Sequence, residues 1–198
     1  MHKNITREEF TNGYWYSNEL KEFGKEIGIK NYSKLRKDEL EGIVIHFIKT
    51  GIIEKETKRI TGKTQDKLSL DTIIENYKND RRTKEFILQA AFKKNPELKL
   101  KSGSIYWLNR WREDKIKSGI KITYEQLINE FIKLNFNKGK LPQIPSAKMN
   151  NFITDYLKNE TDSKRKDAVN EWIKLKELNI PKDYKSWKLY ILKNNGAV

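Results

Sequence analysis

The N-terminal quarter of the chain places its apolar residues in two short blocks with helical spacing. Leu20, Phe23 and Ile27 fall on one face of a first helix. The second block repeats the i, i+3, i+4, i+7 spacing with Leu40, Ile43, Val44, Phe47 and Ile48. Between the blocks, Gly28 can end the first helix and Ile29 can fill the gap between the two. The pattern predicts two amphipathic helices joined by a short extended segment.

Cations gather where the second of these helices is expected to begin. Lys34, Arg36 and Lys37 fall in its expected first turn. The helix dipole favours anions there by roughly 0.3–1 kcal/mol per charge, so cations at this position invite an anionic partner such as phosphate. The alternative interpretation is a turn that only faces solvent, in which these three cations bind no partner. The candidate nucleic-acid contacts of this segment are Lys30, Ser33, Lys34, Arg36 and Lys37.

The sequence LKEFGKEIGIKNYSKLRKDEL, residues 20–40, resembles the N-terminal module of the transcription terminator Rho. That module belongs to the helix–extended–helix class, together with SAP and LEM domains. The resemblance implies a small helical module that binds DNA or RNA, although some members of the class bind proteins. Two positions depart from the usual pattern. Leu35 stands where a SAP domain has glycine, and Glu41-Gly42 replaces the usual apolar residue after Leu40. Glycine inside a helix costs about 1 kcal/mol relative to alanine, so the second helix is weakened.

Further helices are expected downstream of residue 66. Leu70-Asp71 leads into an expected helix that carries Ile73, Ile74 and Tyr77. Other helices are expected after a Thr83 N-cap, from Ser104 to about Ile116, and after Thr123, where Gln126 completes a capping box. Asn95-Pro96 and Ser118-Gly119 are typical helix ends.

A repeated hexapeptide organises the second half of the chain. Residues 129–134 read NEFIKL and residues 170–175 read NEWIKL, at an offset of 41 residues. Carried along the chain, this offset predicts two divergent helix–turn–helix units, at about 105–136 and 146–178. The segment KGKLPQIPS separates them. Two copies are too few for a solenoid, so we expect them to pack face to face in one helical domain.

These patterns predict an all-α protein with a small module followed by a larger domain. The expected boundaries are a helix–extended–helix module at 1–50, a linker at 51–66, and a basic helical domain at 67–198. This order also resembles an uncharacterised group of bacterial proteins that join a SAP-like module to a helical domain of unknown function. That resemblance implies no particular activity.

Charge divides unevenly between these parts. The chain carries a formal net charge of +14. Residues 1–60 contain 12 Lys+Arg against 10 Asp+Glu, whereas residues 61–198 contain 29 against 17. If the partner is a polyanion, most of the electrostatic attraction should therefore come from the downstream part. The alternative explanation for this excess of positive charge is a well-solvated lysine-rich surface that binds no polyanion.

Catalytic chemistry finds little support in the sequence. There is no cysteine, and the two histidines are His2 near the N-terminus and His46 between apolar neighbours. No phosphate-binding glycine loop or clustered carboxylates stand out. We expect no enzymatic activity, no metal and no cofactor. No apolar run is long enough for a signal peptide or a membrane span, so we expect a cytoplasmic protein.

The downstream candidates for binding are cations on or beside expected helices. In the first unit they share a helix with Trp107 and Trp111, which core packing explains more simply than base stacking. Core packing is also the simpler role for the aromatic lead-in, Phe10, Tyr14, Trp15 and Tyr16. The downstream candidates are Arg110, Arg112, Lys117, Lys164, Arg165 and Lys166.

The sequence therefore predicts a non-catalytic nucleic-acid-binding protein, with DNA preferred over RNA. No residue stands out as a reader of base edges, so we expect contacts with the backbone, weak sequence specificity and strong salt dependence. The alternative is a protein-interaction adaptor, which the near neutrality of residues 1–60 favours. The sequence leaves the oligomeric state open.

Overall fold

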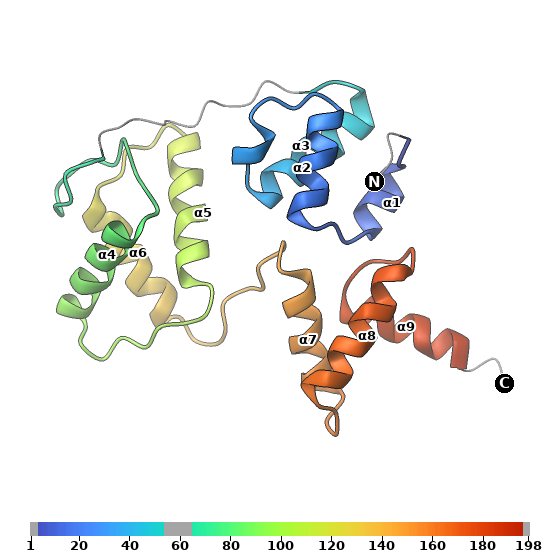
Figure 1. The fold of residues 1–198 in the computed structure, drawn as a ribbon. Coiled ribbons are helices and arrows are strands. Elements are labelled where there is room, and N and C mark those ends of the chain that lie inside the picture. The colour runs from blue at the N-terminus through green and yellow to red at the C-terminus, as the bar shows by residue number, and fades with distance from the viewer. Residues whose placement is uncertain (1–3, 54–64, 196–198) are drawn as a thin grey trace. The chain divides into compact units, whose positions relative to one another are not determined.

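The chain is all-helical in a computed structural model that describes residues 4–53 and 65–195 (Figure 1). Across those two ranges the regular structure consists of α-helices and one short 3-10 helix, and the only β feature is an isolated bridge between Ile73 and Thr123. The all-α prediction is confirmed. Residues 54–64 of the expected linker lie outside the described residues.

Contacts divide the chain into two compact units. Unit 1 combines residues 1–57 with 144–198, and unit 2 is residues 58–143. The boundary at 143/144 falls inside the expected linker KGKLPQIPS. This grouping differs from the expected order, in which 67–198 is one domain; the domain boundaries predicted from the sequence stay a prediction. Unit 2 carries 20 Lys+Arg against 10 Asp+Glu, a balance of +10, and unit 1 carries 21 against 17, a balance of +4.

The N-terminal part of unit 1 contains α1 (Arg7–Asn12), α2 (Ser17–Glu26), the 3-10 helix η1 (Tyr32–Lys34) and α3 (Lys37–Thr50). The predicted apolar faces of α2 and α3 meet each other, because the i, i+3, i+4 spacing puts these side chains on one side of each helix. Together with α1 and the connecting segments they form one apolar core, whose buried residues are Ile5, Phe10, Leu20, Phe23, Ile29, Leu40 and Val44.

The aromatic lead-in closes this small core. Phe10 is buried and stacks on Trp15 with ring centroids 5.9 Å apart. The Trp15 indole N–H donates to the Phe10 carbonyl oxygen at 2.9 Å, so the polar edge of a half-buried ring is satisfied. The expected core packing is confirmed for Phe10 and Trp15. Tyr16 is instead 48% exposed.

The C-terminal part of unit 1 is built from α7 (Lys148–Asn159), α8 (Arg165–Glu177) and α9 (Tyr184–Asn195). Aromatic side chains fill its core: Phe152 contacts Trp172 and Trp187 with centroids 5.6 and 5.9 Å apart. Tyr14 reaches this core from the lead-in and meets Trp172 edge-on at 5.0 Å. The sequence patterns did not predict α9.

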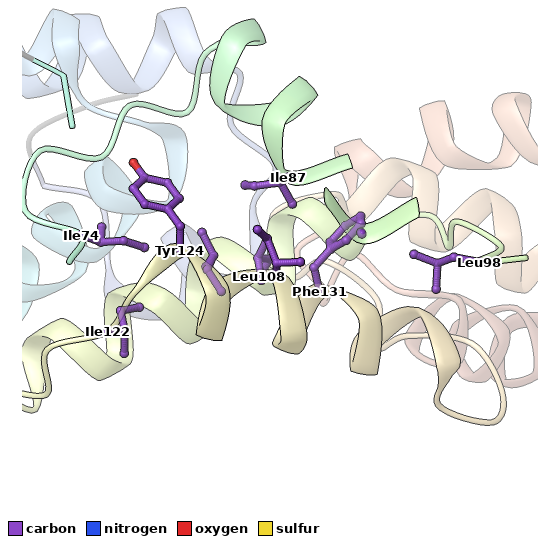
Figure 2. Packing of buried hydrophobic residues seen from close by; sticks show 10 residues of the cluster. Ile74, Ile87, Leu98, Leu108, Ile122, Tyr124 and Phe131 are labelled. Carbon is purple, nitrogen blue, oxygen red and sulfur yellow. The ribbon is translucent and has the colours of Figure 1, made fainter. Parts of the chain in front are cut away.

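Unit 2 packs α4 (Arg81–Lys94), α5 (Ser104–Lys117) and α6 (Tyr124–Phe136) around one apolar core. Figure 2 shows α6 contributing Tyr124 and Phe131, with Leu108 from α5 and Ile87 from α4. All four side chains are 0% exposed. Leu98, Ile74 and Ile122 extend the cluster at its ends (Figure 2).

The prediction of a helix around Ile73, Ile74 and Tyr77 is wrong. This stretch is irregular and lies against the start of α6, because its backbone groups bond outside the segment. Ile74 N–H donates to the Ile122 carbonyl at 2.9 Å. The Asp66 carboxylate accepts from the backbone N–H groups of Glu75 and Asn76 at 3.2 and 2.8 Å. These hydrogen bonds compete with helical ones for the same groups.

Local signals located most of the other helix ends correctly. Thr123 caps α6 as predicted: its side chain accepts from Gln126 N–H at 3.3 Å, and Gln126 Oε1 accepts from Thr123 N–H at 2.9 Å. At α4 the N-cap is Asp80, whose Oδ1 accepts from Thr83 N–H at 2.9 Å. Thr83, the expected cap, is fully buried in the first turn.

The two expected helix–turn–helix units correspond to α5–α6 and α7–α8, and the helices within each pair contact each other. Phe131 and Trp172, the aromatic positions of the repeated hexapeptide, are 0% and 2% exposed and belong to the cores of their own pairs. The helix pairs are compatible with a repeat. They belong to different compact units, α5–α6 to unit 2 and α7–α8 to unit 1.

Candidate nucleic-acid interface

The connection between α2 and α3 depends on two glycines. Gly28 adopts φ +91°, a conformation that L side chains rarely take, and thereby ends α2. Ile29 N–H then donates to the Gly24 carbonyl at 2.8 Å, and the Ile29 side chain turns into the core at 3% exposure. A Cβ at Gly24 would lie 3.4 Å from Ile29, Tyr32 and Leu40 side chains, so the helices approach closely here. The expected roles of Gly28 and Ile29 are confirmed.

Lys30, Ser33 and Lys34 are exposed on this connection. Lys30 follows the buried Ile29, and Ser33 and Lys34 belong to η1. Asn31 between them has φ +55°, which helps the chain reverse direction. The backbone is therefore tightly folded, and it presents two lysines and a hydroxyl group within residues 30–34. Ammonium and hydroxyl groups are donors suited to phosphate oxygens.

Lys34 lies before the second helix rather than in its first turn. Leu35 and Arg36 are extended, with ψ of 146° and 159°, and α3 begins at Lys37. The physical reason is the half-buried Leu35, which packs against the core and draws the chain out before the helix starts. The prediction that Lys34 occupies the first turn of the helix is wrong, because the extended residues Leu35 and Arg36 separate Lys34 from the start of α3.

Acidic side chains already occupy the N-terminus of α3. Glu39 Oε2 accepts from the Arg36 backbone N–H at 2.7 Å, and Glu39 Oε1 lies 3.1 Å from the Arg36 guanidinium. A second carboxylate lies near the same guanidinium, with Asp38 Oδ1 3.8 Å from Arg36 Nε. These carboxylates satisfy the helix dipole and offset the charge of Arg36. Arg36 therefore presents a partly neutralised cation.

Lys37 faces a different neighbourhood. Its ammonium lies 4.3 Å from the Tyr14 ring centroid and 3.7 Å from Glu41 Oε1. Lys148 of α7 joins this group and donates to the carbonyl oxygens of Thr11 and Gly13 at 3.4 and 3.2 Å. Burial raises the pKa of Glu41 and lowers the pKa of Lys148. Lys37 thus contributes to packing within unit 1.

The α5 candidates divide into paired and exposed residues. Glu113 lies 3.2 Å from Arg110 Nη1 and 3.4 Å from Arg112 Nη2. Arg112 is 14% exposed and stacks over the Tyr77 ring at 4.2 Å. These contacts hold both arginines against unit 2. Lys117, at the last turn of the helix, is exposed.

The candidates at α8 lie at its start, as expected. Lys164 is the N-cap residue, and Arg165 and Lys166 open the helix. All three are exposed. Asp167 accepts from the Lys164 backbone N–H at 2.8 Å, so a carboxylate again serves the helix N-terminus. The three side-chain cations remain on the surface.

The structure places the module and α8 candidates in unit 1 and the α5 candidates in unit 2. It also draws attention to cations that sequence reasoning missed, Lys138 and Lys140, which are exposed just after α6. Their signal in the sequence is the segment FNKGK, where an aromatic residue is followed by two lysines around a glycine.

The described ranges contain no group of three or more His, Asp or Glu residues arranged to hold a metal ion. None of the helices in these ranges combines the length and apolar character needed to cross a membrane. His46, the histidine within the described residues, is half-buried on α3.

The chain matches no curated protein, and it matches no solved structure. Residues 17–40, which cover α2, the connection and the start of α3, match the family model described as Rho termination factor, N-terminal domain. The resemblance to the Rho module is confirmed for these residues. At a coarse level, this match indicates nucleic-acid binding.

Proposed function

We propose that this protein is a non-catalytic nucleic-acid-binding protein, with DNA preferred over RNA, that contacts mainly the sugar-phosphate backbone. One observation carries the proposal: the segment that matches the Rho N-terminal family presents Lys30, Ser33 and Lys34 on an exposed, tightly folded connection. These donors fit phosphate oxygens, and no planar guanidinium or carboxamide group for contacts with base edges is among them. Weak sequence specificity follows.

The distribution of charge assigns different roles to the two units. Residues 1–57 carry 10 Lys+Arg against 10 Asp+Glu, so the module by itself attracts a polyanion weakly. Unit 2 carries +10 of the total +14. We therefore assign positioning to the module and most of the long-range attraction to unit 2.

The test is binding measured as a function of salt. Fluorescence anisotropy with a short DNA duplex, and with single-stranded DNA and RNA, should show an affinity that falls steeply between about 50 and 200 mM salt. Replacing Lys30 and Lys34 together by Gln should reduce the magnitude of the log–log slope by about 2 on duplex DNA, because two phosphate contacts are lost.

A matched control removes the same charge elsewhere in unit 1. Lys158 and Lys185 are exposed on α7 and α9, and replacing both by Gln lowers the net charge equally. The proposal requires a smaller change in slope for this control. Equal effects from the two double variants would remove the assignment of the site to the module, and no binding by the full chain would remove the function.

A protein-interaction adaptor is the second candidate. The zero balance of residues 1–57 favours it, because a neutral module has no net attraction for a polyanion. Under this alternative, nucleic-acid binding would be weak and would not respond to Lys30 and Lys34. The same anisotropy series therefore separates the two candidates.

A further inference from the structure

The end of α6 exposes an aromatic ring that the core does not use. Phe136 is the last residue of α6 and is 58% exposed, the largest value among the aromatic residues of the described ranges. It lies outside the apolar cluster of unit 2, whereas Phe131, five residues earlier, is fully buried in it. The exposed face of this ring is available for a ligand to pack on.

The backbone around Phe136 is firmly held. Asn135, which is 6% exposed, donates through Nδ2 to the Phe131 carbonyl at 2.8 Å. Its Oδ1 accepts from the Lys101 backbone N–H at 2.7 Å. Lys101 also donates through Nζ to the Asn137 carbonyl. The segment before α5 is thereby tied to the end of α6, on both sides of Phe136 in the sequence.

Cations and a second apolar residue accompany the ring. Leu100, in the tied segment, is 51% exposed. Lys99 beside it is exposed, as are Lys138 and Lys140 after the helix. Together, residues 95–101 and 133–143 contain five lysines and a single acid, Glu97. The segment after α6 is anchored as well, because Trp107 Nε1 donates to the Pro142 carbonyl at 2.9 Å.

An exposed aromatic ring on an anchored backbone, with exposed lysines beside it in the sequence, is a combination that binds unpaired nucleotides. A base stacks on the ring, and lysines contact the phosphates on either side. Duplex DNA offers no such face, because its bases are already stacked between neighbours. We propose that the end of α6, with Phe136 as the stacking residue and Lys99, Lys138 and Lys140 as phosphate contacts, binds single-stranded nucleic acid.

This site rests on the proposed function in requiring a nucleic-acid partner, and it adds that the partner has unpaired bases. It lies wholly within unit 2 and uses none of the residues assigned to the module. The two segments around it, with five lysines and one acid, hold +4 of the +10 balance of that unit.

The experiment compares single-stranded and duplex probes with the full chain. Phe136→Leu should weaken binding to single-stranded oligothymidylate and oligouridylate about tenfold, the size expected for one lost stack. Binding to a DNA duplex should change by less than about twofold. Phe136→Tyr keeps the ring and should bind single strands as the wild type does. Comparing oligouridylate with oligodeoxyuridylate, which carries the same base, shows whether the sugar affects this site.

A matched control uses Phe92 of α4, which is 37% exposed in the same unit. Phe92→Leu should leave single-strand binding unchanged. Replacing Lys138 and Lys140 by Gln in the otherwise wild-type chain should reduce the salt dependence of single-strand binding. Unchanged single-strand affinity in Phe136→Leu, with duplex binding intact, overturns this site and leaves the proposed function standing. Loss of all nucleic-acid binding by the wild type overturns both.

Self-association is the other use that an exposed ring could have. Sedimentation velocity of the wild type and of Phe136→Leu distinguishes it. A shift from dimer to monomer in the variant, with single-strand affinity unchanged, would assign the ring to a contact between copies and reject the nucleic-acid site. An unchanged sedimentation coefficient with weakened single-strand binding supports the site.

Discussion

Glu39 accepts a hydrogen bond from the Arg36 backbone N–H at 2.7 Å and lies 3.1 Å from the same residue's guanidinium. One carboxylate therefore caps α3 and offsets the cation at its start. Lys30 and Lys34, on the connection before the helix, are exposed, as is Arg36. The Glu39 carboxylate lowers the net positive charge that Arg36 offers to a phosphate.

Removing the charge of Glu39 should have opposite effects on folding and on binding. Glu39→Gln weakens the cap and should lower the free energy of unfolding by about 0.5 kcal/mol in urea denaturation followed by circular dichroism. It also removes a negative charge beside Arg36, so affinity for DNA should rise. Glu22→Gln on the exposed surface of α2 is the control of equal charge. Weaker DNA binding in Glu39→Gln than in this control would contradict this effect of Glu39 on the charge of Arg36.

Two glycines of the module should respond differently to substitution. Gly42 lies inside α3, and a Cβ there meets nothing within 4 Å. Gly42→Ala should therefore raise the free energy of unfolding by about 0.5–1 kcal/mol through helix propensity. Gly24→Val should lower it by about 1–3 kcal/mol, because the added methyl groups extend beyond a Cβ that already lies 3.4 Å from Leu40. Thermal and urea unfolding measure both, and similar shifts in the two variants would reject the close helix approach.

Lys182 should make stability depend on pH in a mildly alkaline window. It is 5% exposed and donates to the carbonyl oxygens of Leu178 and Ile180. Burial is the main cause that lowers its pKa from 10.5 to about 8. Between these values the unfolded chain binds a proton that the folded chain has lost. The free energy of unfolding should therefore rise as the pH increases from about 8 to 9.5, by on the order of 1 kcal/mol.

The check compares the wild type with Lys182→Met by urea denaturation across that window. The difference in unfolding free energy between the two proteins should shift in favour of the wild type as the pH rises. Lys185→Met, on the exposed face of α9, should show no such trend. A flat difference for Lys182→Met would show that its charged form is not disfavoured in the fold.

Acid should weaken the contact between the end of α7 and α9. Glu160 accepts from Lys188 Nζ at 2.7 Å and from the Tyr184 hydroxyl at 2.6 Å. The hydrogen bond from Lys188, followed by that from Tyr184, lowers the pKa of Glu160. The folded state thus favours the ionised form, and this stabilisation is present above pH ~4.5 and is lost as the pH falls through the lowered pKa.

Glu160→Gln should remove that dependence. Unfolding followed between pH ~3 and 6 should show a shallower fall in stability for Glu160→Gln than for the wild type. Asp162→Asn, in the exposed turn after α7, changes the same charge without these partners. Identical pH profiles for the wild type and Glu160→Gln would contradict the role of the carboxylate.

Local sequence signals predicted the elements whose hydrogen bonds close within a few residues. The paired apolar faces of α2 and α3, the end of α2 at Gly28 and the Thr123–Gln126 box all depend on neighbours within one or two turns. The stretch around Ile73 and Ile74 failed because its apolar spacing is helical while its backbone bonds to Ile122 and to the Asp66 side chain. Those partners lie beyond the reach of a periodicity argument.

The candidate site divides in the same way. The sequence by itself determined the all-α class, the Rho-like segment and the excess of positive charge beyond residue 60, because each follows from spacing, motif or composition. Only the tertiary structure decided which cations are available. Glu113 pairs with Arg110 and Arg112, Lys37 packs over Tyr14, and Phe136 remains exposed at a helix end. Such fates depend on contacts between elements, and these contacts form only when distant parts of the chain pack together.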